Sequence, residues 1–131
     1  MLGQTWRIVV QNATGSPLGA SDTITVVGVP WAFNSSGAVT YGAEVTLVPA
    51  TSGNSLASNA YYHGATQSSN TNVGVKMLLE ANITPSAGQL NFWYQESPDG
   101  GTTWPADGQG NSIGVMTVTA TGAQPTQQTE V

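Results

Sequence analysis

The residue types that carry out catalysis are scarce in this chain, which has one histidine, no cysteine and seven acidic residues. A glycosidase needs two carboxylates at a set spacing across a cleft, and Glu96, Asp99 and Asp107 are acids in neighbouring predicted loops. A hydrolytic triad needs a histidine beside a nucleophile, but His63 lies in a small, polar stretch typical of a loop or an interface. We therefore predict no catalytic residues and a protein that is not an enzyme.

The same shortage limits metal and cofactor sites. One histidine without any cysteine leaves no ligand set for a transition metal. Calcium is an alternative, because Asp99, Asp107 and Asn111 carry oxygen ligands in glycine-rich segments, although their spacing does not match an EF-hand. We predict no bound metal and no cofactor.

Charge is also scarce. Only 7% of the 131 residues are charged, against about 25% in ordinary soluble domains, and the formal net charge is -5. Arg7 and Lys76 are the only cations, too few to displace the counterions of a nucleic acid or to bind an anionic membrane. No apolar run approaches the roughly 20 residues of a membrane span. We therefore expect neither a nucleic-acid partner nor a membrane.

A polar surface with few charges loses little free energy of hydration when another protein covers it. This composition therefore favours a protein that works packed inside an assembly, and the alternative is a secreted or thermally robust β domain.

The elements that position these residues are short strands. Alternating apolar residues predict strands over residues 5–11, 22–29, 38–41, 43–48, 73–80, 90–95 and 112–120. Seven or eight such strands, separated by glycine, proline and asparagine turns, predict an all-β fold: an antiparallel β-sandwich or jelly-roll-like barrel. We expect a single domain over residues 1–123 and an extended polar tail over residues 124–131.

Two segments leave alternatives open. Pro30 is expected to end the second strand, because proline has no N–H for a strand ladder, so Trp31 and Phe33 fall in a loop. They either plug the open end of the sandwich or lie exposed as a contact. Residues 49–72 form an unusually long connection, either a functional loop, an arm ordered against a neighbour, or a poorly formed strand around residues 60–63.

Residues 90–104 predict a β-hairpin, with Leu90, Phe92 and Tyr94 on one face and a returning strand over residues 102–104. The turn resembles the Asp-box of sialidases and other β proteins, S-x-D-x-G-x-T-W, through the five matching residues Ser97, Asp99, Gly101, Thr103 and Trp104. The resemblance implies a structural hairpin away from any catalytic centre. It argues against a sialidase, which carries several copies of the motif and an arginine cluster.

The overall composition resembles small virion proteins of tailed bacteriophages, which are all-β, free of cysteine, poor in charge and rich in glycine, threonine, serine and asparagine. Many of them carry hairpins like residues 97–104, and capsid decoration (cement) proteins are the closest type. The resemblance implies a structural protein of the virion, assembled in the bacterial cytoplasm, that binds the outside of a phage head and stabilises it. Its implied partners are the major capsid protein and neighbouring copies in a trimer or other homo-oligomer.

The candidate interface residues come from the chain ends and the aromatic loops, and they are Met1, Leu2, Trp6, Trp31, Phe33, Tyr61, Tyr62, His63, Gln127 and Val131. The main alternative is a carbohydrate-binding or host-adhesion module of a tail or fibre. Its aromatic platform would be Trp93, on the face opposite Phe92, or else Tyr61, Tyr62 or Trp31. A glycosidase is the third alternative.

Overall fold

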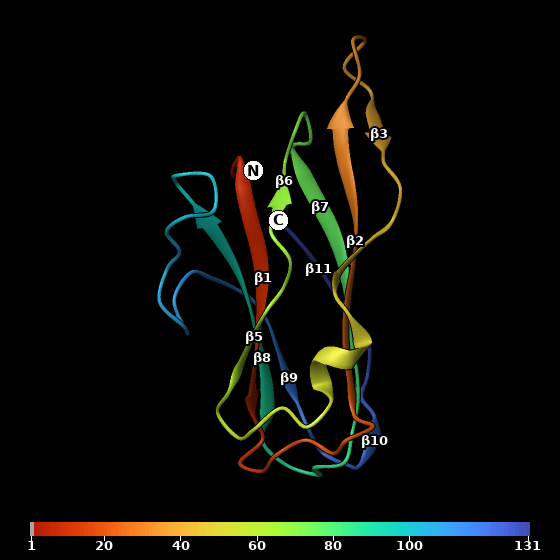
Figure 1. Cartoon of the computed structure of the whole chain (residues 1–131). Coiled ribbons are helices and arrows are strands. Elements are labelled where there is room, and N and C mark those ends of the chain that lie inside the picture. Colours follow the sequence, from red (N-terminus) through yellow and green to blue (C-terminus); the bar gives the residue numbers. More distant parts are fainter. Residues whose placement is uncertain (1) are drawn as a thin grey trace.

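The protein is an antiparallel β-sandwich, as predicted (Figure 1). The computed structural model describes residues 2–131. The first sheet has the order β5-β1-β8-β9, with β6 also paired to β1, and the second has the order β10-β7-β2-β3, with β11 paired to β7 and β4 to β2.

The strands of the first sheet are β1 (Thr5–Ala13), β5 (Tyr61–His63), β6 (Gln67–Ser68), β8 (Gln89–Ser97) and β9 (Asn111–Thr117). Those of the second are β2 (Thr23–Phe33), β3 (Val39–Tyr41), β4 (Val45–Val48), β7 (Gly74–Ile83), β10 (Gly122–Ala123) and β11 (Gln127–Glu130). A 3-10 turn, η1 (Ala50–Gly53), lies between β4 and β5. The strands outnumber the predicted seven or eight because three edge positions are each shared by two short strands.

The core lies between the two sheets and follows the predicted alternation. In β8, Leu90, Phe92 and Tyr94 are buried, and in β7 every second residue from Val75 to Ile83 is buried. Because neighbouring residues of a strand point to opposite faces, the other set of side chains lies on the outside of each sheet. These outward faces carry the candidate sites described below.

The prediction that Pro30 ends the second strand is wrong, since β2 continues through Pro30 to Phe33. The carbonyl of Pro30 accepts a hydrogen bond from the Gly42 N–H, so its nitrogen also faces the β3–β4 side of β2. That side is interrupted opposite Pro30, where β3 has ended and β4 has not begun. The missing N–H therefore costs no ladder bond, and Trp31 and Phe33 lie in a strand rather than a loop.

The predicted returning strand over residues 102–104 is also absent. The hairpin partner of β8 is β9, which pairs Tyr94 with Asn111, and residues 98–110 connect the two strands. The side chains of Ser97 and Asp99 accept hydrogen bonds from the N–H groups of Gly101 and Thr103. These backbone groups are bonded inside the turn and not to β8.

The C-terminal tail is extended, but it is a strand of the sandwich and not a segment outside the domain. Residues of β11 pair with β7 from Leu79 to Lys76, and the backbone of Val131 exchanges two hydrogen bonds with Val75. Gln124 is buried, and Val131 packs against the core. The polar sequence concealed this role because an edge strand needs only its backbone groups to pair.

The long connection of residues 49–72 contains η1, β5 and β6, which confirms the alternative of a strand around residues 60–63. The buried Asn12 amide holds it to β1 by donating hydrogen bonds to the carbonyls of Leu56 and Ala57. The connection is thus one edge of the first sheet.

Candidate functional site

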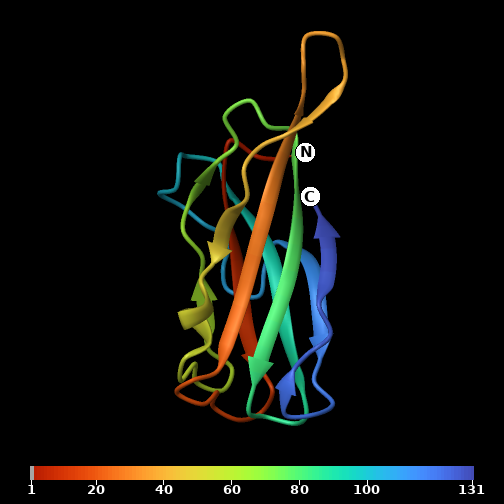
Figure 2. The ribbon, with the colours of Figure 1, turned by 90° about the vertical axis from the view of Figure 1, so that its right-hand side faces the viewer.

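The most distinctive surface feature is a hairpin that projects beyond the body of the sandwich (Figures 1 and 2). We call it the arm; it consists of residues 31–41, which include the end of β2, a tight turn and β3. The Asn34 carboxamide oxygen accepts hydrogen bonds from the N–H and hydroxyl of Ser36 and from the N–H of Ala38, at 2.7–3.0 Å. Gly37 has a φ of 81°, which closes the turn at no steric cost. The arm is therefore fixed by its own sequence.

The arm displays large apolar side chains to solvent. The exposed fractions are 56% for Phe33, 48% for Val39 and 58% for Tyr41. Phe33 packs edge-on against Trp31, with ring centres 5.6 Å apart. These four residues share one face, because Phe33 pairs with Val39 and Trp31 pairs with Tyr41 across the hairpin. Isolated exposed apolar residues are ordinary, but a contiguous set indicates a surface that another molecule covers.

The apolar surface continues from the arm along the outward face of β2. A shallow groove of about 290 Å³ has Val27, Val29 and Leu78 in its lining. Lys76 and Tyr41 lie across it, joined by a 3.0 Å hydrogen bond between the ammonium and the phenol oxygen. This hydrogen bond and the electrostatic attraction of Tyr41 raise the pKa of Lys76. The pair separates this groove from a second hollow of about 220 Å³ that reaches Trp31 and Val39.

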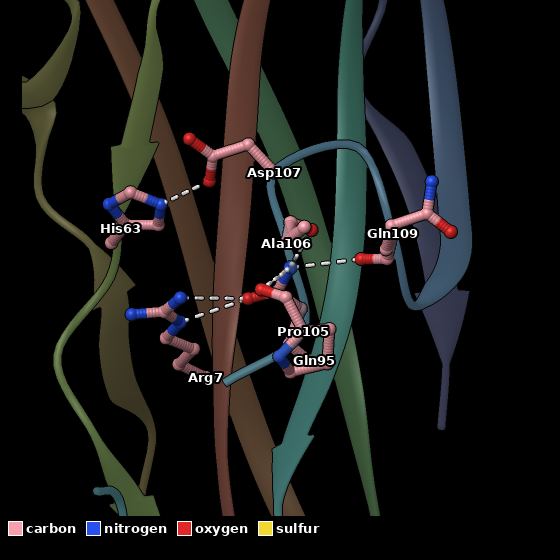
Figure 3. Close-up of polar contacts among 7 residues, drawn as sticks. All are labelled: Arg7, His63, Gln95, Pro105, Ala106, Asp107 and Gln109. Atoms are coloured by element: carbon pink, nitrogen blue, oxygen red, sulfur yellow. Dashed lines mark hydrogen bonds and ion pairs between the residues drawn. The ribbon is translucent and has the colours of Figure 1, made fainter. Parts of the chain in front are cut away.

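A separate polar cluster lies on the outward face of the first sheet (Figure 3). The guanidinium of Arg7 donates two hydrogen bonds, of 3.1 and 2.9 Å, to the side-chain oxygen of Gln95. The Gln95 amide donates in turn to the carbonyls of Ala106 and Gln109, at 3.2 and 2.9 Å. Burial lowers the pKa of Arg7, and the nearby charge of Asp107 partly offsets this effect. The cluster thus holds residues 98–110 against the sheet.

His63 and Asp107 lie at the rim of this cluster and pair through Nε2 and a carboxylate oxygen, with both side chains exposed (Figure 3). Beside them, the rings of Tyr61 and Trp93 are 5.8 Å apart and tilted by 39°. Both rings are partly buried. Through these contacts, His63 and Tyr61 attach the edge strand β5 to β8 and to the connection that contains Asp107.

The Asp-box-like turn has the closed geometry that its sequence implies. Ser97 donates a 2.8 Å hydrogen bond to Asp99, whose carboxylate also accepts the Thr103 N–H at 2.8 Å. The Trp104 indole N–H donates to the Gly101 carbonyl at 3.0 Å. Hydrogen bonds from the Thr103 side chain and backbone, and from Ser97, lower the pKa of Asp99 to about 2.

Each of the three acids considered for catalysis is bonded to a different neighbour. Glu96 accepts a 2.8 Å hydrogen bond from the Tyr94 hydroxyl, Asp99 closes its turn, and Asp107 pairs with His63. Within residues 2–131, no three histidine, aspartate or glutamate side chains cluster in a way that would hold a metal ion. No helix over the same residues is long and apolar enough to cross a membrane.

The structure places the candidate interface residues in different parts of the molecule. Leu2 and Trp6 lie in the core, where they are covered by the protein itself, and Met1 lies outside the described residues. Tyr62 and Val131 pack against the core edge, Gln127 lies in β11, and Tyr61 and His63 belong to the first-sheet surface. Of the set, Trp31 and Phe33 lie together on the arm.

Val39 and Tyr41, the other half of the arm, were missed as interface residues. The available signal was the hairpin pattern itself, in which apolar residues at 31 and 33 and at 39 and 41 flank the turn sequence NSSG. Ending the strand at Pro30 hid this pattern.

Comparison of the chain with protein-family models, with curated proteins and with solved structures finds no match.

Proposed function

We propose that this protein is a structural virion protein of the capsid decoration type, which binds the outside of a phage head and braces it. The observation that carries the proposal is the arm, a preformed hairpin with Phe33, Val39 and Tyr41 held in solvent. The shortage of charge over the whole chain supports it, because a surface with few ions is cheap to dehydrate.

The energetics favour binding through the arm. Full burial of an exposed phenylalanine, valine or tyrosine-sized side chain contributes about 1.5–3 kcal/mol. The bonds of Asn34 fix the turn before binding, so little conformational entropy is lost on contact. Many copies that bind only the assembled shell would stabilise that state by mass action.

The test is occupancy of purified phage heads by the wild-type protein and by Phe33→Ser and Tyr41→Ser. We expect both variants to lose most of their occupancy while remaining folded, with only a small loss in free energy of unfolding from the contacts with Trp31 and Lys76. Val115→Ser is the matched control, because Val115 is similarly exposed, at 47%, but lies in β9 of the other sheet. Heads that bind all three variants equally, or that do not bind the wild type, would contradict the proposal.

A second candidate function is carbohydrate binding for host adhesion, favoured by the Tyr61–Trp93 pair. Gln11 and Asn91 lie beside it in the first sheet, joined by a 3.0 Å hydrogen bond between their amides, so aromatic faces and polar groups adjoin. A glycan array with wild-type protein and Trp93→Ala tests it. Glycan binding that disappears with Trp93→Ala favours the adhesion module, and absence of binding removes it.

A further inference from the structure

The unpaired edge of β3 presents backbone N–H and C=O groups in a pattern that matches the same edge of a second copy. β3 pairs only with β2, so one side of it is unpaired in the described structure. The backbone groups of Ala38 and Gly42 face the β2 side, because the Ala38 carbonyl accepts the N–H of Asn34, just after β2, and the Gly42 N–H donates to the Pro30 carbonyl. Because the direction of the backbone groups alternates along a strand, Thr40 also faces β2, and Val39 and Tyr41 direct their N–H and C=O groups to the free edge.

Apart from its length of three residues, this edge lacks the features by which proteins protect exposed strands. Such protection comes from very short strands, charged side chains, proline, bulges or a covering segment. Residues 38–42 read AVTYG and contain neither charge nor proline, and all three residues of β3 are exposed. The second sheet's opposite edge is different, because β11 carries Glu130 and follows Pro125.

We propose that two copies of this chain pair through their β3 edges, antiparallel about a two-fold axis at Thr40. In this register Val39 of one copy lies opposite Tyr41 of the other, and each such pair exchanges both N–H to C=O hydrogen bonds. The symmetry makes two such pairs, so every free backbone group of β3 at Val39 and Tyr41 is bonded. The second sheets of the two copies join into one continuous sheet.

The side chains fit the same register. A valine opposite a tyrosine is a favourable cross-strand pair, and the register makes it twice. Phe33 and Trp31 lie behind them on the same face, so the two arms form one apolar surface. Lys76, which donates a hydrogen bond to the Tyr41 hydroxyl, lines the two hollows beside the arm together with Glu44 and Glu130. Each copy therefore brings charges of both signs to this face.

The chain contains no cysteine, which makes disulfide trapping a clean test. In the proposed register the two Thr40 residues form a non-hydrogen-bonded pair, with Cα atoms about 4.5 Å apart. That separation falls within the range of about 4.4–6.8 Å that a disulfide spans. Thr40→Cys should therefore crosslink two copies under mild oxidation. Ser36→Cys is the control, because Ser36 is exposed on the same arm but lies far from the axis.

Sedimentation of the cysteine-free chain gives the second readout. We expect the wild type to dimerise with increasing concentration, and Val39→Pro to stay monomeric, because it lacks the N–H aimed at the free edge. Val39→Lys, which places a charge on the edge, serves where the proline variant fails to fold. Monomeric wild type together with no preferential crosslink at position 40 overturns the inference.

The pairing deepens the proposed function but can fail separately from it. Dimers that crosslink at position 40 and ignore phage heads would refute the decoration role and keep the pairing. A protein that occupies phage heads but neither dimerises nor crosslinks would refute the pairing and keep the decoration role. A crosslink from position 40 to a cysteine of a shell protein, without a homodimer, would assign the edge to that partner and overturn the inference.

Discussion

The guanidinium of Arg7 lies 4.2 Å from the centre of the Trp104 ring, although the two residues come from β1 and from the connection after β8. Arg7 also forms a double hydrogen bond with Gln95, whose amide holds the carbonyls of residues 105, 106 and 109. One arginine, directly and through Gln95, therefore holds residues 104–109, the second half of the connection between β8 and β9.

Arg7→Lys should destabilise the protein, because an ammonium keeps the charge but loses the planar double hydrogen bond and the stacked ring. We expect a cost of about 1–2 kcal/mol in chemical unfolding from the lost hydrogen bond and cation–π contact. Lys76→Arg is the control, since Lys76 is the only other lysine or arginine of the chain and lies in β7 of the other sheet. Equal stability of Arg7→Lys and wild type would show that the stack contributes nothing.

The Asp99 turn should make stability depend on pH. The folded pKa of about 2 lies below the ordinary value of 3.8, so the turn's contribution is complete above about pH 4 and is lost as the pH falls toward 2. Asp99→Asn should be less stable than wild type at pH 7, and the difference should shrink across that window. The measurement is the free energy of unfolding at a series of pH values.

Glu80→Gln provides the comparison for this experiment, because Glu80 is exposed on β7 and its side chain accepts no hydrogen bond in the described part of the chain. Its difference from wild type should not follow the Asp99 curve. A constant gap between Asp99→Asn and wild type from pH 7 to 2 would count against the lowered pKa.

Asp22 joins two loops at the end of the sandwich opposite the arm. Its oxygens accept hydrogen bonds from Gly19 N–H, Thr84 N–H and the Thr84 hydroxyl, at 2.7–2.8 Å. Burial alone would raise the pKa of Asp22, but the bonds from Thr84 and Gly19 outweigh it, and its pKa is lowered.

Asp22→Ala leaves these donors unpaired and should cost about 1–3 kcal/mol. Asp22→Asn should cost less, because its single oxygen still accepts both backbone N–H groups and its amide can donate to the Thr84 hydroxyl. Urea unfolding ranks the two variants. The clamp would be dismissed if asparagine were as damaging as alanine.

The sequence predicted the interior strands well because burial imposes a period of two. The core face of β7 can be predicted from the sequence, because alternation places Val75, Met77 and Leu79 on the same side of the strand. Pro30 and the C-terminal tail were misread for the opposite reason. A gap opposite Pro30 and a backbone partner for β11 are properties of the neighbouring chain segments, and local composition does not encode them.

The tail therefore gives a prediction opposite to the one its polar sequence suggests. Removing residues 124–131 should destabilise the whole sandwich, because it exposes the β7 edge and takes Gln124 and Val131 from the core margin. We expect a lower unfolding midpoint and concentration-dependent aggregation through the bare edge. Glu130→Gln, which keeps β11, should behave as wild type. A truncated protein with unchanged stability would mean that β11 contributes only local order.

Gly74 lies opposite Trp31 in the β2–β7 ladder and leaves room for the Trp31 ring at the base of the arm. A Cβ at position 74 would lie 2.5 Å from the Trp31 indole nitrogen and 2.6 Å from the adjoining ring carbon, so Gly74→Ala must displace the ring. We expect overpacking to cost about 1–3 kcal/mol and amide exchange in the arm to accelerate. Trp31→Phe should relieve the clash, and it also removes an indole N–H that is buried without a partner among the described residues. In a double-mutant cycle, Gly74→Ala should therefore cost less in the Trp31→Phe background than in wild type. Strictly additive costs would mean that the ring moves freely and that Gly74 does not set the position of the arm.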